Sequence, residues 1–297
     1  MREDIFSGYH PIVNFIYFVI IIGCSMFMLH PVFLILSCLG GFFYYVYIKR
    51  WKAFKTALWL MLPVFLISAA VNPLFNHQGV TIIKYLRTGN PLTLESLIYG
   101  LATGFMLVSV LNWFSCYQTV MTSDKFIYLF GKIIPSMSLV LSMVLRLVPK
   151  FKIQFEKVAF SQKCIGKNLS EGNMIKRVRN GMSIFSIVTT WALENSVETA
   201  DSMRSRGYGL RGRTNYSIYR FDTRDKIATL LLGVMGATVV AGILMKKVHC
   251  LYYPIMQIND NTPWAWAVYI SYGCLCFFPW VINIIEDVKW HYLKSKI

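Results

Sequence analysis

The chain has 297 residues, of which 56% are hydrophobic and only 15% charged. A soluble domain carries about 25% charged residues, so this composition excludes an ordinary soluble protein and favours a polytopic membrane protein. The formal net charge of +16 then indicates basic cytoplasmic loops and contact with the anionic headgroups of a lipid bilayer. We expect no nucleic acid partner.

Six apolar runs are candidates for transmembrane helices. They lie near residues 12–29, 32–48, 57–71, 94–114, 227–245 and 264–285. A span of about 20 residues crosses roughly 30 Å of hydrocarbon, and the second and third runs are short by this measure. Lys49, Lys52 and Lys55 end the second run. Because cytoplasmic loops are enriched in Lys and Arg, we expect both termini and the long middle segment to be cytoplasmic.

The predicted fold class is therefore an all-α polytopic membrane protein, with about six transmembrane helices and long cytoplasmic helices. Residues 1–115 would form the first four spans, 116–225 a cytoplasmic or interfacial region, and 226–297 the last spans. The connection 74–93 contains the turn signal Gly89-Asn90-Pro91, so we expect a loop there.

The middle segment is too long for a loop without structure, and its pattern is helical. We expect an apolar helix over 134–148, bounded by Pro149, and an amphipathic helix over 150–166 that ends at Gly166. A third helix is expected over 173–206, stopped by Gly207 and Gly209. Its apolar positions are Ile175, Val178, Met182, Phe185, Val188 and Ala192.

The end of the third helix carries an unusual charged motif, Ala-Asp-Ser-Met-Arg-Ser-Arg-Gly-Tyr-Gly at 200–209. Arg204 and Arg206 lie about 200° apart around a helix, and each guanidinium could bind a carboxylate or carbonyl group. Gly207 allows the backbone to turn and a partner to approach closely. The alternative is an ordinary basic helix end, which the helix dipole favours. The pattern alone leaves both interpretations open.

This motif resembles the signature of the transmembrane T component of energy-coupling factor (ECF) transporters, a family that includes the cobalt-type membrane subunits. Other short motifs also resemble this family. They are His10-Pro11, His30-Pro31 and Asn-Pro-Leu at 72–74. The family has two short Ala-Arg-Gly-type motifs at the ends of coupling helices. The second is present as Ser205-Arg206-Gly207, preceded by Arg204. The first should fall at 162–166, where the sequence is Gln-Lys-Cys-Ile-Gly.

The first motif departs from the family pattern, because Cys164 and Ile165 stand where Ala and Arg are usual. Lys163 alone supplies positive charge there, and Gly166 is retained. The resemblance therefore implies one complete and one altered docking tip. The implied docking residues are Arg204, Ser205, Arg206, Gly207, Lys163 and Gly166.

The resemblance also implies the partners. The tips of a T component dock into two cytoplasmic ATP-binding subunits, and the protein links them to a membrane S component that captures a vitamin or metal ion. The chain itself would be non-catalytic, with no cofactor or metal of its own and ATP bound by the partner subunits. The sequence agrees, because neither Gly131-Lys132 nor Gly166-Lys167 has the upstream Gly and following Ser or Thr of a P-loop.

Two alternatives belong to other classes. A stand-alone secondary transporter or channel usually carries ionisable residues inside its spans, and the six runs contain almost none. Asn14 and Asn112 are their notable polar residues, which we expect to form packing hydrogen bonds. An intramembrane enzyme would need a nucleophile or a metal set within a span. The histidines instead lie at helix ends or in loops, at positions 10, 30, 77, 249 and 291.

Overall fold

The computed structural model describes residues 4–76, 78–85, 91–131, 134–167, 173–208, 210, 219–245, 248, 250–254, 256–258 and 262–295. The chain divides into two compact units. Unit 1 comprises Met1–Lys125 and Tyr219–Ile297, and unit 2 comprises Phe126–Ile218. Histidines 77 and 249 and Gly209 lie outside the described residues.

The structure confirms a nearly all-α chain. The helices are η1 (Phe6–Gly8), α1 (Pro11–Phe27), α2 (Pro31–Phe75), α3 (Leu94–Val120), α4 (Ser123–Gly131), α5 (Pro135–Cys164), α6 (Met174–Ser205), α7 (Thr223–Leu244) and α8 (Pro263–Lys294). The strands are β1 (Ile82–Tyr85), β2 (Pro91–Thr93), β3 (Cys250–Leu251) and β4 (Gln257–Ile258).

Four helical stretches of the described chain are long and apolar enough to cross a membrane. They are Pro31–Lys49, Leu94–Val120, Thr223–Leu244 and Pro263–Lys294. Two shorter apolar helices, Pro11–Phe27 and Met61–Phe75, coincide with the first and third predicted runs. These helices make the chain a multi-pass membrane protein.

Helix α2 contains two predicted spans that run in opposite directions along α3. In the first half of α2, Ser37 contacts Ser109 and Gly41 contacts Trp113, so the two helices run in the same direction. In the second half, Phe65 contacts Gly104 and Ala69 contacts Gly100, so the two helices run in opposite directions. These contacts place the reversal of direction between Gly41 and Phe65.

The second apolar run ends at Lys49, as expected, but the helix itself continues through residues 49–55. The stretch contains Lys, Arg and Ala, which favour helix, and neither Gly nor Pro.

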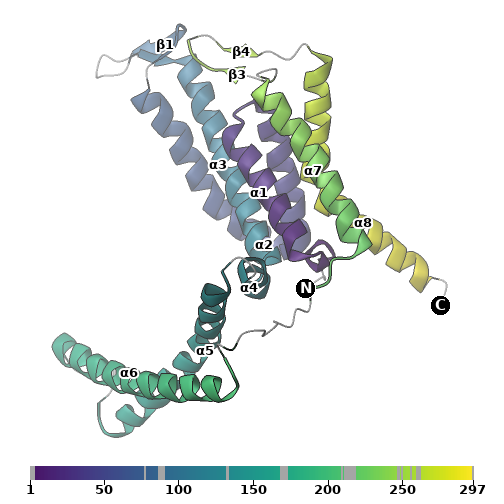
Figure 1. Cartoon of the computed structure of the whole chain (residues 1–297). Coiled ribbons are helices and arrows are strands. Elements are labelled where there is room, and N and C mark those ends of the chain that lie inside the picture. Colours follow the sequence, from purple (N-terminus) through teal and green to yellow (C-terminus); the bar gives the residue numbers. More distant parts are fainter. Residues whose placement is uncertain are drawn as a thin grey trace. The chain divides into compact units, whose positions relative to one another are not determined.

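The helices of unit 1 pack around a buried aromatic core. Trp113, Tyr17, Tyr44, Tyr272 and Phe6 are its largest fully buried side chains. The N-terminal segment contacts α8 at one end of this bundle, where the Ile5 N–H donates to Asn283 Oδ1 at 2.9 Å. Figure 1 shows the strands at the opposite end.

The predicted loop 74–93 contains a short hairpin. Strands β1 and β2 are antiparallel, with Ile82 opposite Thr93 and Tyr85 opposite Pro91. Ile and Tyr favour strands, and this local signal was missed beside the turn residues. Gly89 and Asn90 lie outside the described residues. A second hairpin, β3–β4, also joins two helices of unit 1.

The two His-Pro pairs begin two neighbouring helices in the same way. His10 and His30 are the N-cap residues of α1 and α2, and each Nδ1 accepts a backbone N–H two residues later at 3.3 Å. The following proline occupies the first helical position, where its missing N–H costs nothing. These pairs therefore mark where helices begin.

Unit 2 contains two long helices that pack on one another. Helix α5 continues through Pro149, so the two helices expected over 134–148 and 150–166 are one. The ring of Phe151 packs edge-on against Trp191 of α6, with centroids 5.7 Å apart. A single proline removes one backbone hydrogen bond and can kink a helix without ending it.

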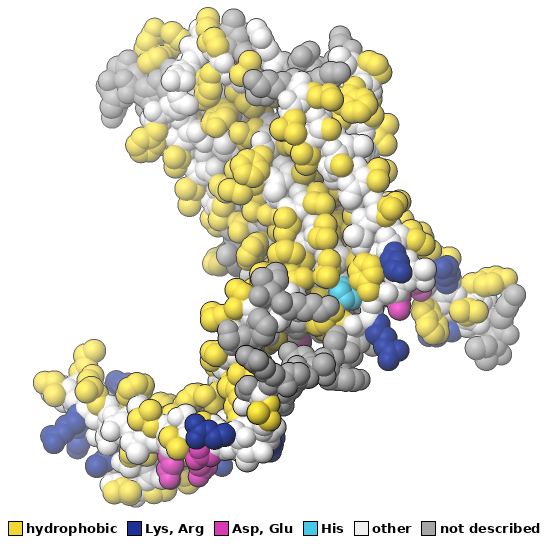
Figure 2. All heavy atoms as spheres, in the orientation of Figure 1, with side chains coloured by type: hydrophobic (Ala, Val, Ile, Leu, Met, Phe, Trp, Pro, Cys, Tyr) yellow, Lys and Arg dark blue, Asp and Glu magenta, His cyan; other side chains and the backbone are white. Residues whose placement is uncertain are grey.

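The predicted apolar face of α6 is mostly uncovered within this chain. Ile175, Val178, Met182 and Phe185 are 60–79% exposed. The residues of α6 that are buried are Asn180, Ile184 and Val188. Figure 2 shows hydrophobic side chains interspersed with Lys and Arg on the visible surface of unit 2. The periodicity identified an apolar helix correctly but not which side contacts α5.

Candidate functional site: two capped helix tips

The tip of α6 is held by two backbone hydrogen bonds. The N–H of Gly207 donates to the Arg204 carbonyl at 3.0 Å, and that of Tyr208 to the Met203 carbonyl at 3.1 Å. Gly207 has φ +75°, which glycine adopts without the strain of a side chain. This pair of bonds is the Schellman motif. It ends the helix at Ser205 and leaves Arg206 on the cap.

The tip of α5 has the same motif. The N–H of Gly166 donates to the Lys163 carbonyl at 3.0 Å, and that of Lys167 to the Gln162 carbonyl at 3.0 Å. Gly166 has φ +80°. The helix ends at Cys164, and Ile165 is the cap residue.

The matching caps place the two motifs in register. Lys163 corresponds to Arg204, Cys164 to Ser205, Ile165 to Arg206, and Gly166 to Gly207. The backbone of Ile165 has φ −92° and ψ 9° and that of Arg206 φ −83° and ψ 5°. All six predicted docking residues are exposed except Gly207, which is half-buried. The structure thus presents each tip on the surface of unit 2.

The chemistry of the tips suits recognition. Arg204 and Arg206 provide guanidinium donors, and Lys163 an ammonium group, for carboxylate or carbonyl acceptors. One to three turns before the α6 tip, Glu194, Glu198 and Asp201 are exposed.

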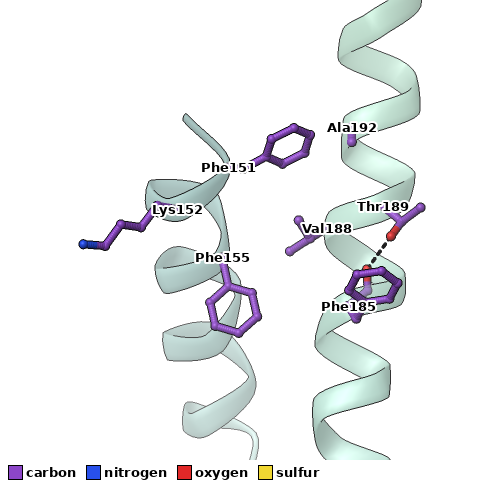
Figure 3. Close-up of a pocket in the computed structure, with 7 residues that line it drawn as sticks. All are labelled: Phe151, Lys152, Phe155, Phe185, Val188, Thr189 and Ala192. Carbon is purple, nitrogen blue, oxygen red and sulfur yellow. Dashed lines mark hydrogen bonds between the residues drawn. The ribbon is translucent and has the colours of Figure 1, made fainter. Parts of the chain in front are cut away.

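An apolar groove lies between α5 and α6, away from the tips. Figure 3 shows Phe151 and Phe155 from α5 facing Phe185, Val188 and Ala192 from α6, while Lys152 points away. The groove has a volume of about 540 Å³. Phe185, Val188 and Ala192 were predicted as apolar positions of α6, but the groove was not predicted.

Sequence reasoning also missed the contacts that hold the chain where unit 1 leads into unit 2. Lys125 is buried, and its Nζ donates to the carbonyl oxygens of Ser7 and, at 2.9 Å, Val120. Burial lowers the pKa of Lys125, and the charge of Asp4 partly opposes this. No local pattern marks this lysine, because its partners are backbone groups distant in sequence.

The returning chain is held by the same N-terminal segment. The ring of Phe221 lies edge-on to the ring of His10, with centroids 4.9 Å apart, and Tyr219 packs on the same ring at 6.5 Å. The backbone N–H of His10 donates to Asp225 Oδ1 at 3.1 Å. Segment 4–14 thus contacts the chain on both sides of unit 2.

The polar residues within the spans are buried in helix contacts. Asn14 and Asn112 are 0% and 3% exposed. In the amide orientation that satisfies both of its polar atoms, Asn14 donates to the Phe6 carbonyl at 3.0 Å and accepts from Lys125 Nζ at 3.3 Å. These are the packing hydrogen bonds expected of Asn14.

No protein-family model matches the chain, but curated proteins are similar to it. The energy-coupling factor transporter transmembrane protein EcfT 1 of Listeria monocytogenes is 24% identical over 204 residues, which cover 64% of this chain and 73% of that protein. The EcfT proteins of Bacillus selenitireducens and Lactobacillus helveticus are 28% and 30% identical over 106 and 107 residues. The chain is therefore similar, at modest identity, to transmembrane proteins of ECF transporters.

The alignments with the latter two relatives cover 35% and 34% of this chain and 40% and 39% of the relatives' own length. None of these relatives is named as an enzyme.

Proposed function

We propose that this chain is the T component of an ECF-type importer, a non-catalytic multi-pass subunit in the plasma membrane of a prokaryote. The observation that carries the proposal is the similarity to an EcfT protein over 64% of the chain. The positive charge of residues 116–225 supports a cytoplasmic position for this segment, with both termini on the same side.

In this proposal the tips of α5 and α6 dock into two cytoplasmic ATP-binding subunits. The chain holds no cofactor, and the partners bind ATP. Two features support the docking role: both tips are exposed, and both are fixed by the same cap. In this proposal, movement of an ATP-binding subunit moves the helix whose capped end it contacts.

The helices would pass this motion to a substrate-binding S component that captures a vitamin or metal ion. The uncovered apolar face of α6, with Ile175, Val178, Met182 and Phe185, supports an additional protein contact because a large exposed apolar patch often marks an interaction site.

The experiment that tests this proposal is co-purification of ATP-binding subunits with the tagged chain from its native membranes. Arg206→Ala should weaken retention of the ATP-binding subunit that the α6 tip contacts at least tenfold, because truncating one partner of a buried charged pair costs about 2–5 kcal/mol. Arg179→Ala is the matched control, since Arg179 is exposed near the other end of α6. Gel filtration in detergent checks that both variants insert and fold.

Normal retention of the ATP-binding subunits by Arg206→Ala would contradict the docking role. Substrate flux through the chain alone in liposomes would instead support the alternative function, a stand-alone secondary transporter or channel.

A further inference from the structure

We infer that the two tips recognise chemically different surfaces: the tip of α5 inserts Ile165 into an apolar pocket, whereas the tip of α6 presents Arg206 to carboxylate or carbonyl acceptors. The two partner grooves are then not interchangeable. This inference rests on the proposed function, which assigns a docking role to both tips, and it concerns what each tip binds.

The first step is that the α5 tip is intact. A tip that lacks the usual Arg need not keep the helix cap. Instead, Gly166 has nearly the same φ as Gly207, +80° against +75°, and the same two cap hydrogen bonds are present. The difference between the tips is therefore confined to side chains on equivalent backbones.

The second step is the chemistry at the equivalent position. Ile165 is 70% exposed and stands where Arg206 stands on the other tip. Phe160, also 70% exposed, and the exposed Cys164 lie one turn apart on α5. Single exposed apolar side chains are ordinary, but this helix ends with three of them within six residues. At the cap position, the end of α5 therefore presents an apolar side chain where the end of α6 presents a guanidinium group.

The third step is the charge around this apolar end. Lys163 and Lys167 are exposed on either side of Ile165, so the surface that fits this tip is an apolar pocket with carbonyl or carboxylate groups at its rim. The surface that fits the α6 tip has such groups at its centre, where Arg206 reaches.

These two surfaces exclude each other's tip. A guanidinium in the apolar pocket would lose its hydration without gaining a partner. An isoleucine against the central acceptors of the other groove would leave them buried and unpaired. Specificity thus arises from what each groove rejects as well as from what it binds.

The test exchanges the two cap residues in the tagged full chain, expressed in its native host. The variants are Ile165→Arg, Arg206→Ile and the double exchange, with Ile165→Leu as the matched control. Each complex is purified in detergent, and each ATP-binding subunit retained by the wild-type chain is quantified by mass spectrometry. Because both cap residues are exposed, the exchanges leave the buried core unchanged.

We expect Ile165→Arg to reduce the retained amount of one ATP-binding subunit about ten- to a hundredfold. This range corresponds to the free energy gained by burying one large aliphatic side chain. The other subunit should stay bound. Arg206→Ile should give the opposite pattern, and Ile165→Leu should resemble the wild type. The double exchange should retain more of each subunit than the single exchange that loses it, because each groove then meets its matching cap side chain on the equivalent backbone of the other tip.

Three results would overturn the inference. These are equal or tighter retention in Ile165→Arg, loss of the same subunit in both single exchanges, and a wild-type complex with two copies of one ATP-binding polypeptide. A wild-type chain that retains no ATP-binding subunit would reject the proposed function itself, which is a distinguishable outcome.

Discussion

Trp113 Nε1 donates a hydrogen bond to Ser37 Oγ at 2.9 Å, which joins α3 to α2 among buried side chains. Ser37 Oγ also lies 2.9 Å from Ser25 Oγ of α1 and 2.5 Å from Ser109 Oγ of α3. All four side chains are at most 2% exposed. One hydroxyl group therefore connects three helices within the buried core.

Replacing this hydroxyl should destabilise unit 1. Ser37→Ala leaves the indole N–H of Trp113 without this acceptor, and we expect a loss of about 1–2 kcal/mol. The measurement is the thermal unfolding midpoint in detergent. In a Trp113→Phe background the same change should cost less, because the indole donor is already absent. Equal costs in both backgrounds would show that the Trp113–Ser37 bond contributes nothing.

Substitution by alanine should have opposite effects on stability at two helical glycines. A Cβ on Gly100 of α3 would lie 2.7 Å from the carbonyl oxygen of Ala69, so Gly100→Ala should force α2 and α3 apart and cost about 1–3 kcal/mol. Gly233 of α7 has nothing within 4 Å of the same position. Gly233→Ala should leave the unfolding midpoint unchanged or raise it, because alanine favours helix. A neutral Gly100→Ala would mean that the packing of α2 on α3 can relax.

Asp225 should stabilise the fold through hydrogen bonds to both of its carboxylate oxygens. Oδ1 accepts the His10 backbone N–H and Oδ2 the Asp222 backbone N–H, each at 3.1 Å. Asp225→Asn keeps one amide acceptor, whereas Asp225→Ala keeps none. The stability measured by thermal unfolding should therefore fall from wild type to Asn to Ala, by about 1–3 kcal/mol for each buried donor left without an acceptor. Equal midpoints for the two variants would contradict the two-bond role.

Lys125 should give a pH-dependent contribution to stability. Because burial lowers its pKa in the folded chain, the unfolded chain binds more protons between that pKa and the ordinary lysine value of about 10.4. Stability from this group therefore rises with pH through that window and falls as pH is lowered through the folded-state pKa. The unfolding midpoint of wild type should rise relative to that of Lys125→Met between pH 8 and 10.5. A constant difference would show that burial does not shift this pKa.

The apolar runs predicted the helices of unit 1 because a run of about 20 uncharged residues has few other stable structures in a membrane. The two runs 32–48 and 57–71, with basic residues between them, predicted that the chain reverses direction there. That the connection between them is helical was not predicted, although residues 45–61 lack the Gly or Pro that usually stops a helix.

The candidate site was partly visible in the sequence. Gly166 and Gly207 were predicted to end two helices, and both helices end there. The sequence did not predict that the two helix ends share one backbone geometry. The reason is that Lys163-Cys164-Ile165 and Arg204-Ser205-Arg206 have little in common. The groove between α5 and α6 depends on which side of α6 is covered, which periodicity does not specify.

The chain leaves unit 1 after Lys125 and returns at Tyr219, and both residues contact the short segment that contains Ser7 and His10. The two junctions are thus neighbours in space. Unit 2 is accordingly an insertion, in the sense that a short linker between these junctions would leave the direction of every span unchanged. Such an arrangement allows the inserted helices to diverge in length and sequence between related proteins while the bundle keeps its topology.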